Sequence, residues 1–180
     1  MNFPKGFSVA GLAAGIKKSG AKDLALIVNV GKNKSGAAVF TKNRMTAAPV
    51  IWSKQVVRDG RIDAVIINSG GANACTGVEG FADTHKSAEF VAKKLGISAS
   101  DVAVCSTGLI GERLPMEKIL QGIDEAANQL LSEGWPNAAE AIMTTDSHSK
   151  IATHEINGVQ FVGIAKGAGM LAPALATMIS

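Results

Sequence analysis

The sequence contains no tyrosine, few other aromatic residues and only two cysteines. Aromatic residues make up 4% of its 180 positions, so the core has to be built mainly from alanine, valine, isoleucine and leucine. Cys75 and Cys105 are too few and too far apart for a disulfide framework or a zinc motif, so a reducing cytoplasm is the expected compartment. No base lies near Cys105 in the sequence, and we interpret this thiol as a core residue.

The sequence also lacks an excess of charge of one sign and any long apolar run. Its net charge is only +3, and no cluster of basic residues is interleaved with aromatics, which argues against nucleic acid as a partner. The apolar stretch at 9–16 contains two glycines and is far shorter than the roughly 20 residues of a membrane-spanning helix. It is not followed by a cleavage site of the signal-peptide type. We therefore expect neither a membrane segment nor an export signal.

Apolar residues and glycines are abundant. The chain is 47% hydrophobic and contains 20 glycines, which is enough for a substantial core crossed by many tight turns. Its length suits one domain, and we expect residues 1–180 to form a single α/β unit in which helices are layered on a sheet.

Apolar periodicity and turn residues predict the secondary structure. Strands are predicted at 7–16 (with a turn), 24–29, 37–41, 50–52, 64–68, 102–105, 151–155 and 159–164, and helices at 53–59, 81–95, 115–131 and 137–142. The polar turn at 31–35 predicts a hairpin between the second and third strands. Asn157-Gly158 is the strongest signal for a two-residue hairpin in the chain.

Two predicted strands run into glycine-bearing loops. The loop at 106–111, Ser-Thr-Gly-Leu-Ile-Gly, exposes backbone N–H groups and the hydroxyl of Thr107, which together suit an oxyanion hole. The alternative is an ordinary strand-to-helix turn in which serine and threonine cap the helix. The loop at 68–77 holds Asn73, which either contacts a substrate or braces the neighbouring turn.

The last fifteen residues carry the most specific pattern. Glycines follow Lys166, and a run of small residues leads through Ala176 to Thr177. A threonine hydroxyl can attack the peptide bond on its own N-terminal side, and the freed α-amine can then act as its general base. The alternative is a plain loop threonine. A positively charged Lys166 beside such a nucleophile would suit the carboxylate of an amino-acid substrate.

These motifs together resemble the ornithine acetyltransferase family of arginine biosynthesis, whose members are bifunctional glutamate N-acetyltransferases. The patterns that carry the resemblance are N-x-G-x-A-N-A at 68–74, S-T-G-x-I-G at 106–111, A-x-M-T-T-D at 141–146 and K-G-x-G-M-x-x-P-x-x-A-T at 166–177. The match extends over essentially the whole chain, which would be the N-terminal (alpha) chain of a self-cleaving precursor.

The resemblance implies a layered α/β sandwich of the N-terminal-nucleophile type and a role for each motif. Thr177 would be the nucleophile, exposed by cleavage between Ala176 and Thr177. The oxyanion donors would be Thr107 and Gly108. Lys166 and Thr144 would bind substrate together with Thr177. Thr145 is the alternative to Thr144 as the residue that binds substrate, and Asp146 would order the turn.

The reaction implied by the resemblance moves an acetyl group from N-acetylornithine to glutamate through an acetyl-threonine intermediate. It needs no metal or other cofactor, although acetyl-CoA as a second acetyl donor stays open. The partner would be a beta chain from the same precursor, in an alpha2-beta2 heterotetramer, and this chain alone is expected to be inactive. Because it continues to Ser180, it is interpreted as an uncut or a truncated precursor piece, or else the cut lies elsewhere.

Other functions remain as alternatives. A self-processing aminopeptidase or amidohydrolase of the same fold would pass the acyl group to water instead of glutamate. In a non-catalytic binding subunit Thr177 would be inert, and a small-molecule-binding domain would use the glycine-rich loops instead. The three histidines at 85, 148 and 154 have no acidic or thiol partner at ligand spacing, so a metal site is not expected.

Overall fold

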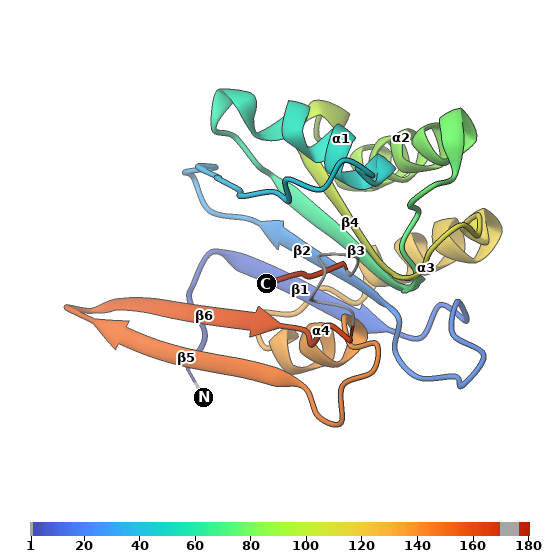
Figure 1. Ribbon diagram of the computed structural model, residues 1–180. Helices are drawn as coiled ribbons and strands as arrows, with labels where there is room; N and C mark the ends of the chain where they lie inside the picture. Colours follow the sequence, from blue (N-terminus) through green and yellow to red (C-terminus); the bar gives the residue numbers. More distant parts are fainter. Residues whose placement is uncertain (1, 170–176) are drawn as a thin grey trace.

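The computed structural model describes residues 2–169 and 177–180, and a four-stranded mixed sheet forms its centre (Figure 1). The strands lie in the order β1 (Phe7–Leu12), β2 (Leu24–Asn29), β3 (Ala64–Gly71) and β4 (Val102–Leu109). β2 is antiparallel to both of its neighbours, β1 and β3, whereas β3 and β4 run parallel. The carboxyl ends of β3 and β4 therefore meet at the same edge of the sheet, each followed by a glycine-bearing loop.

Three helices cover one face of the sheet. They are α1 (Ala48–Val56), α2 (Gly77–Leu95) and α3 (Met116–Asn128), with short 3-10 turns at Val57–Asp59 and Ala99–Asp101. The connection from β3 to the parallel β4 passes through α2, as a parallel pair requires. The core on this side is aliphatic, and its largest buried members include Leu24, Leu26, Val91, Val102, Ile119 and Ile123.

The opposite face packs against a short helix and a hairpin. These are α4 (Trp135–Ala141), β5 (Lys150–Ile156) and β6 (Val159–Ala165), and Figure 1 shows them below the sheet. The core between them and the sheet includes Val9, Ala25, Ile67, Trp135, Ile142 and Ile164. The molecule thus has three layers, and the expected α/β architecture is confirmed. None of the helices within 2–169 and 177–180 has both the length and the apolarity needed to cross a membrane.

Several local predictions are confirmed. Leu24–Asn29 is a strand with the predicted bounds, and β3 and β4 begin where expected but continue into the glycine loops as far as Gly71 and Leu109. Asn157 and Gly158 both have positive φ, at 51° and 80°, so they form the two-residue turn predicted between β5 and β6.

Two predicted strands are wrong. Residues 50–52 lie within α1, in which Pro49 occupies the first turn, where a missing N–H costs nothing. Residues 37–41 form no strand, and near them the described chain makes only an isolated bridge between Ser35 and Arg61. A hairpin with β2 is impossible because both edges of β2 are already paired, with β1 and with β3.

Helix boundaries also differ from the predictions. α2 begins at Gly77 rather than at residue 81, and α3 ends at Asn128 rather than near residue 131. α4 begins at Trp135 with proline in its first turn, so Asn137 lies inside the helix instead of capping it. Ser53 lies in the middle of α1 rather than at the start of a helix.

Candidate active site

The candidate site begins with two threonine hydroxyls at the end of β4. Thr107 is fully buried on the face of the sheet that packs against α4 and the hairpin. Its Oγ1 lies 2.5 Å from Oγ1 of Thr177, and either oxygen can be the donor. The preceding residue points to the other side of the strand, where Ser106 Oγ donates to Asn68 Oδ1 at 2.5 Å. Strand alternation thus aims the Thr107 hydroxyl at the C-terminal segment.

Lys166, at the end of β6, holds that segment in place. Its side chain is buried, and its Nζ donates to the backbone oxygens of Gly167 and, at 3.2 Å, of Thr177. The Lys166 N–H donates to the Ile179 oxygen at 3.1 Å. Burial lowers the pKa of Lys166, nearby Asp146 raises it, and nearby Lys150 lowers it further, with a downward net result.

Asp146 joins the turn after α4 to the end of β6. Its Oδ2 accepts the N–H of Thr144 at 3.0 Å, while Oδ1 accepts the N–H of Gly167 and, at 2.5 Å, Nζ of Lys150. Burial alone would raise the pKa of Asp146, but these three hydrogen bonds hold it well below its usual range. The carboxylate therefore stays ionised and clamps the 144–146 turn beside Lys166.

The structure places both candidate threonines of this turn next to the 166–169 segment. Thr144 is partly buried and is attached through the Asp146 clamp, whereas Thr145 is exposed. A Cβ built on Gly169 would lie 3.9 Å from Oγ1 of Thr145. Thr144 and Thr145 therefore remain alternative ligands for a substrate.

Lys17 is a member of this region that the sequence did not reveal. Its Nζ donates to the backbone oxygens of Met143 and Lys22, both at 2.8 Å, and so supports the chain just before Thr144. Burial lowers the pKa of Lys17, while Asp23 and Asp146 act in the opposite direction. Lys17 and Met143 are 126 positions apart, so no local pattern could have indicated the contact.

Gly108 lies directly against the backbone of the neighbouring loop. Its φ is +128°, and a Cβ on it would meet the carbonyl carbon of Gly70 at 2.5 Å and the nitrogen of Gly71 at 2.7 Å. Only glycine fits this position without a shift of the backbone. The turn at 108–111 is thus held in one conformation next to the Thr107 hydroxyl.

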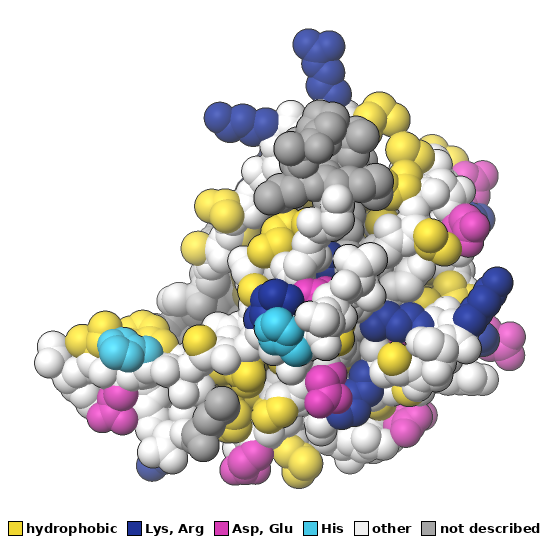
Figure 2. All heavy atoms as spheres, turned by 60° about the horizontal axis from the view of Figure 1, so that its bottom comes forward, with side chains coloured by type: hydrophobic (Ala, Val, Ile, Leu, Met, Phe, Trp, Pro, Cys, Tyr) yellow, Lys and Arg dark blue, Asp and Glu magenta, His cyan; other side chains and the backbone are white. Residues whose placement is uncertain are grey.

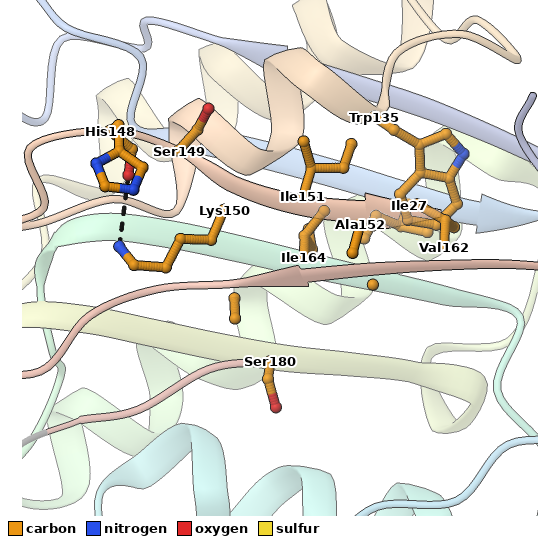
Figure 3. Close-up of a pocket in the computed structure, with 12 residues that line it drawn as sticks. Ile27, Trp135, His148, Ser149, Lys150, Ile151, Ala152, Val162, Ile164 and Ser180 are labelled. Carbon is orange, nitrogen blue, oxygen red and sulfur yellow. Dashed lines mark hydrogen bonds between the residues drawn. The ribbon is translucent and has the colours of Figure 1, made fainter. Parts of the chain in front are cut away.

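A wide hollow of about 830 Å³ lies between the hairpin and the sheet (Figure 3). Neither Thr107 nor Thr177 is among the described residues that line it. Ile27, Trp135, Ile151 and Val162 give it an apolar wall. At its other end lie polar residues that include Lys150, the partner of Asp146, and Ser180 near the end of the chain. The hollow therefore adjoins the candidate site through these two residues.

The other candidate metal-binding and nucleophilic side chains are less suited to catalysis. Within 2–169 and 177–180, no group of three or more histidine, cysteine, aspartate or glutamate side chains is arranged to hold a metal ion. His85 lies against Trp52, with ring centroids 4.9 Å apart, and pairs with Glu89. Cys105 packs in the core, and burial raises the pKa of its thiol to about 11, so the thiolate nucleophile is disfavoured.

The structure thus brings three of the predicted site residues, Thr107, Lys166 and Thr177, into direct contact. Gly108 follows in the turn, and Thr144 is joined through the Asp146 clamp. Ala176, the predicted residue before the cut, lies outside the described residues. Paired hydroxyls beside a buried ammonium group can exchange a proton and can stabilise negative charge on an oxygen.

Fold and site together define a layered α/β protein whose candidate centre is a pair of threonine hydroxyls beside a buried lysine. The chain belongs to the ArgJ family, whose model matches residues 8–180. It is 58% identical to the arginine biosynthesis bifunctional protein ArgJ of Thermobifida fusca, covering 98% of this chain and 46% of that protein. The protein of the same name from Streptomyces coelicolor is also 58% identical, over 97% of this chain and 46% of the relative. The chain therefore spans about half the length of the curated relatives it matches.

Two solved structures share the fold. The crystal structure of an ornithine acetyltransferase from Mycobacterium tuberculosis, in complex with ornithine, matches with a TM-score of 0.90 and 50% identity, covering 98% of this chain and 94% of that one. The arginine biosynthesis bifunctional protein ArgJ from Bacillus halodurans matches with a TM-score of 0.84 and 39% identity, over 98% and 92% of the two chains.

Proposed function

We propose that this chain is the N-terminal part of a self-cleaving acetyltransferase of arginine biosynthesis, which moves an acetyl group from N-acetylornithine to glutamate. The observation that carries the proposal is the contact between the hydroxyls of Thr107 and Thr177, 2.5 Å apart, in a member of the ArgJ family. Relatives of this chain include bifunctional proteins of arginine biosynthesis and an ornithine acetyltransferase crystallised with ornithine, which supports the choice of substrates.

The first step is cleavage of the chain before Thr177. The Thr177 hydroxyl attacks the carbonyl carbon of Ala176, the peptide C–N bond breaks, and the hydroxyl proton goes to the departing nitrogen. Water then hydrolyses the resulting ester, which leaves a carboxylate on Ala176 and a free α-amine and hydroxyl on Thr177. The α-amine is then available as the general base for the adjacent hydroxyl.

Acetyl transfer follows by two displacements. Thr177 Oγ1 attacks the acetyl carbonyl of N-acetylornithine while its proton passes to the α-amine and then to the departing ornithine nitrogen. The amine of glutamate next attacks the acetyl-threonine ester and gives up a proton to restore the Thr177 hydroxyl. N-acetylglutamate leaves, and the enzyme is regenerated.

Thr107 and Gly108 stabilise the oxyanion that forms in each displacement. The Thr107 hydroxyl already lies within hydrogen-bond reach of the nucleophilic oxygen, and the oxyanion is the former carbonyl oxygen on the carbon that this nucleophile attacks. The N–H of Gly108 is the second donor, in a turn that leaves no space for a side chain.

Lys166 has two roles in this proposal. As an ammonium group it attracts the α-carboxylate of the substrate, together with the hydroxyl of Thr144 or Thr145. Its charge near Thr177 also lowers the pKa of the Thr177 α-amine by repulsion between like charges, which makes the amine a base suited to neutral pH.

The remaining part of the enzyme is a beta chain that begins at Thr177 and pairs with this chain in an alpha2-beta2 assembly. This chain alone is then inactive, because part of the substrate site lies in the other half. No cofactor is needed, and acetyl-CoA is a candidate second donor in a bifunctional enzyme. The expected cytoplasmic location likewise stays a prediction.

Intact-mass spectrometry of the complete reading frame tests the first step. Wild-type protein is expected to appear as two fragments that meet between Ala176 and Thr177, and the Thr177→Ala variant as one uncut chain. Thr107→Ser should still be cut, whereas Thr107→Val, which lacks the hydroxyl, should be cut about a hundredfold more slowly. An uncut wild-type chain would remove the basis for the mechanism.

Incubation of the cleaved enzyme with N-acetylornithine tests the second step. An added mass of one acetyl group is expected on the fragment that begins with Thr177, and glutamate should remove it as N-acetylglutamate. Loss of the acetyl group to water at the same rate without glutamate would favour the hydrolase alternative. The same assay with acetyl-CoA in place of N-acetylornithine decides whether the enzyme also accepts the thioester.

A further inference from the structure

Asn73 lies in the loop between β3 and α2, buried completely, with a positive φ of 48°. Its amide nitrogen donates to the Gly80 oxygen at 2.8 Å and to Thr84 Oγ1 at 2.9 Å. Its amide oxygen accepts the hydroxyl of Thr76 at 2.7 Å. Because the polar atoms of the side chain are committed to the start of α2, the side chain is not directed at a substrate.

The backbone on either side of Asn73 is bonded to the turn that follows Thr107. The N–H of Ala72 donates to the Leu109 oxygen at 2.8 Å, and the N–H of Gly111 donates to the Ala74 oxygen at 2.9 Å. These two bonds join the residues immediately before and after Asn73 to the two ends of the segment Leu109–Gly111. The two loops therefore lie side by side, and a change in the backbone of one changes the backbone of the other.

A second contact fixes the far side of the same turn to the same helix. Arg113 donates from Nε and an Nη atom to both carboxylate oxygens of Asp83, at 2.7 and 2.8 Å, and the Asp83 side chain is buried. Asp83 and Thr84 are adjacent on α2. The first turns of α2 thus hold the 72–74 loop through Asn73 and the end of the 108–113 segment through Arg113.

We propose that Asn73 is a positioning residue for the oxyanion turn: its side chain fixes the loop against which Gly108 is oriented. This inference rests on the proposed function, in which Thr107 and Gly108 stabilise the oxyanion. Gly108 touches the last two residues of β3, which lead directly into this loop, since a Cβ on it would come within 2.8 Å of three backbone atoms of Gly70 and Gly71. A shift of this loop therefore moves the oxyanion donors, whereas Lys166 and the 144–146 turn are held by separate contacts.

The expected kinetic effect is a fall in kcat with little change in substrate binding. An oxyanion donor acts on charge that develops only in the transition state, and a displacement of an ångström or less costs about ten- to a hundredfold in rate. A residue that contacted the substrate would change KM and the affinity for ornithine as well.

The test uses the complete, self-cleaved protein and four variants. Asn73→Gly removes the amide but tolerates the positive φ, so the backbone is not strained by the substitution itself. Thr84→Val removes one partner of the amide, and Thr84→Ser retains the hydroxyl and serves as its conservative counterpart. Ser87→Ala is the matched control, because Ser87 is also buried on α2 but, within the described part of the chain, its hydroxyl bonds only to the helix oxygen of Asp83.

In Asn73→Gly, kcat for acetyl transfer should fall about ten- to a hundredfold while KM and ornithine affinity stay within about twofold. The fall in kcat should be smaller in Thr84→Val. The kcat values of Thr84→Ser and Ser87→Ala should match that of the wild type. Unchanged kcat in Asn73→Gly, or an equal loss in affinity, would overturn the inference.

Hydrogen exchange provides a readout that is independent of activity. The Gly111 N–H is protected by its bond to Ala74, and its exchange should quicken in Asn73→Gly but not in Ser87→Ala. If the wild-type enzyme transferred no acetyl group, the proposed function would fail. The role of Asn73 in holding the turn would still be decided by this measurement, because unchanged protection of Gly111 contradicts it.

Discussion

At the scale of single residues, Gly108 shows how closely the candidate site depends on backbone contact. Its positive φ and its approach to Gly70 and Gly71 are separate constraints, and both exclude a side chain. Gly111, three positions later, also has a positive φ, of +88°, but no atom of the described residues lies within 4 Å of the place where a Cβ would lie. A comparison of the two glycines therefore separates the effect of backbone strain from the effect of close contact.

Gly108→Ala should destabilise the protein more than Gly111→Ala. Both substitutions place a side chain in the left-handed region, at a cost of about 1–2 kcal/mol, but only Gly108→Ala adds a clash with backbone atoms, worth about 1–3 kcal/mol more. Denaturant unfolding of both variants measures the difference. Equal losses in the free energy of unfolding would mean that the approach of Gly108 to Gly70 is not tight in solution.

The charges around Lys166 form a second residue-scale feature. Burial lowers the pKa of Lys166 from its usual 10.5, Asp146 raises it, and Lys150 lowers it. On the proposed mechanism, the ammonium form binds the substrate carboxylate, so activity falls on the alkaline side as Lys166 loses its proton.

The pH profile of acetyl transfer should therefore respond in opposite directions to two substitutions. Asp146→Asn removes the negative charge that raises the Lys166 pKa, so the alkaline limb should move to lower pH. Lys150→Gln removes the charge that lowers this pKa, so the limb should move to higher pH. Profiles of kcat/KM from pH 7 upward measure both, and shifts in the same direction would exclude Lys166 as the titrating group.

At the scale of elements, α1 protects the outer edge of the sheet. Among the residues that the structure describes, β4 pairs with a strand on one side only, where it meets β3. On its other side, Ser53 Oγ donates to the Val104 oxygen at 2.7 Å and accepts the Val104 N–H at 2.9 Å. Trp52 Nε1 donates to the Val102 oxygen at 2.9 Å. Side chains of α1 thus complete the hydrogen bonds that an additional strand would have made.

Ser53→Ala should lower the free energy of unfolding by about 1–3 kcal/mol, because it leaves a buried N–H and C=O of Val104 without a partner. Ser87→Ala, which removes one hydrogen bond within a helix, should cost less than about 1 kcal/mol. Chemical denaturation compares the two. A loss in Ser53→Ala no larger than in Ser87→Ala would show that water replaces the serine at the strand edge.

The same contacts explain why the sequence mispredicted this element. Val50, Ile51 and Trp52 form a short apolar run that a helix and a strand can both accommodate. The helix prevails because of its tertiary contacts with β4. By contrast, β2 and the hairpin at 150–165 were predictable, since an apolar run bounded by polar residues and an Asn-Gly turn act locally.

At the scale of the whole molecule, the hairpin exposes an apolar face. Ile156, Val159 and Phe161 are each about half exposed, and Figure 2 shows hydrophobic side chains along this projecting arm. The opposite side of the hairpin packs in the core through Ile151, Val162 and Ile164. An apolar face on a projecting hairpin suits contact with another chain, and on the proposed function that chain is the beta half.

The 180-residue chain on its own should therefore self-associate. Phe161→Ser should reduce the association, because it removes the largest side chain of the exposed hairpin face. Val39→Ser, at an isolated and fully exposed position away from the hairpin, should have no effect. Sedimentation velocity over a range of concentrations measures the association of the wild type and of both variants. A wild-type chain that stays monomeric throughout would contradict the prediction.

The sequence by itself determined the α/β class, most strands, the Asn-Gly hairpin and the motifs that lead to Thr107, Lys166 and Thr177. These depend on local periodicity, turn chemistry and short patterns, which are properties of the sequence and do not require tertiary contacts. Only the tertiary structure decided that α1 is a helix, that Asp146 clamps two segments and that Lys17 supports the chain before Thr144. Those features depend on contacts between residues far apart in sequence, and such contacts exist only once the layers have packed.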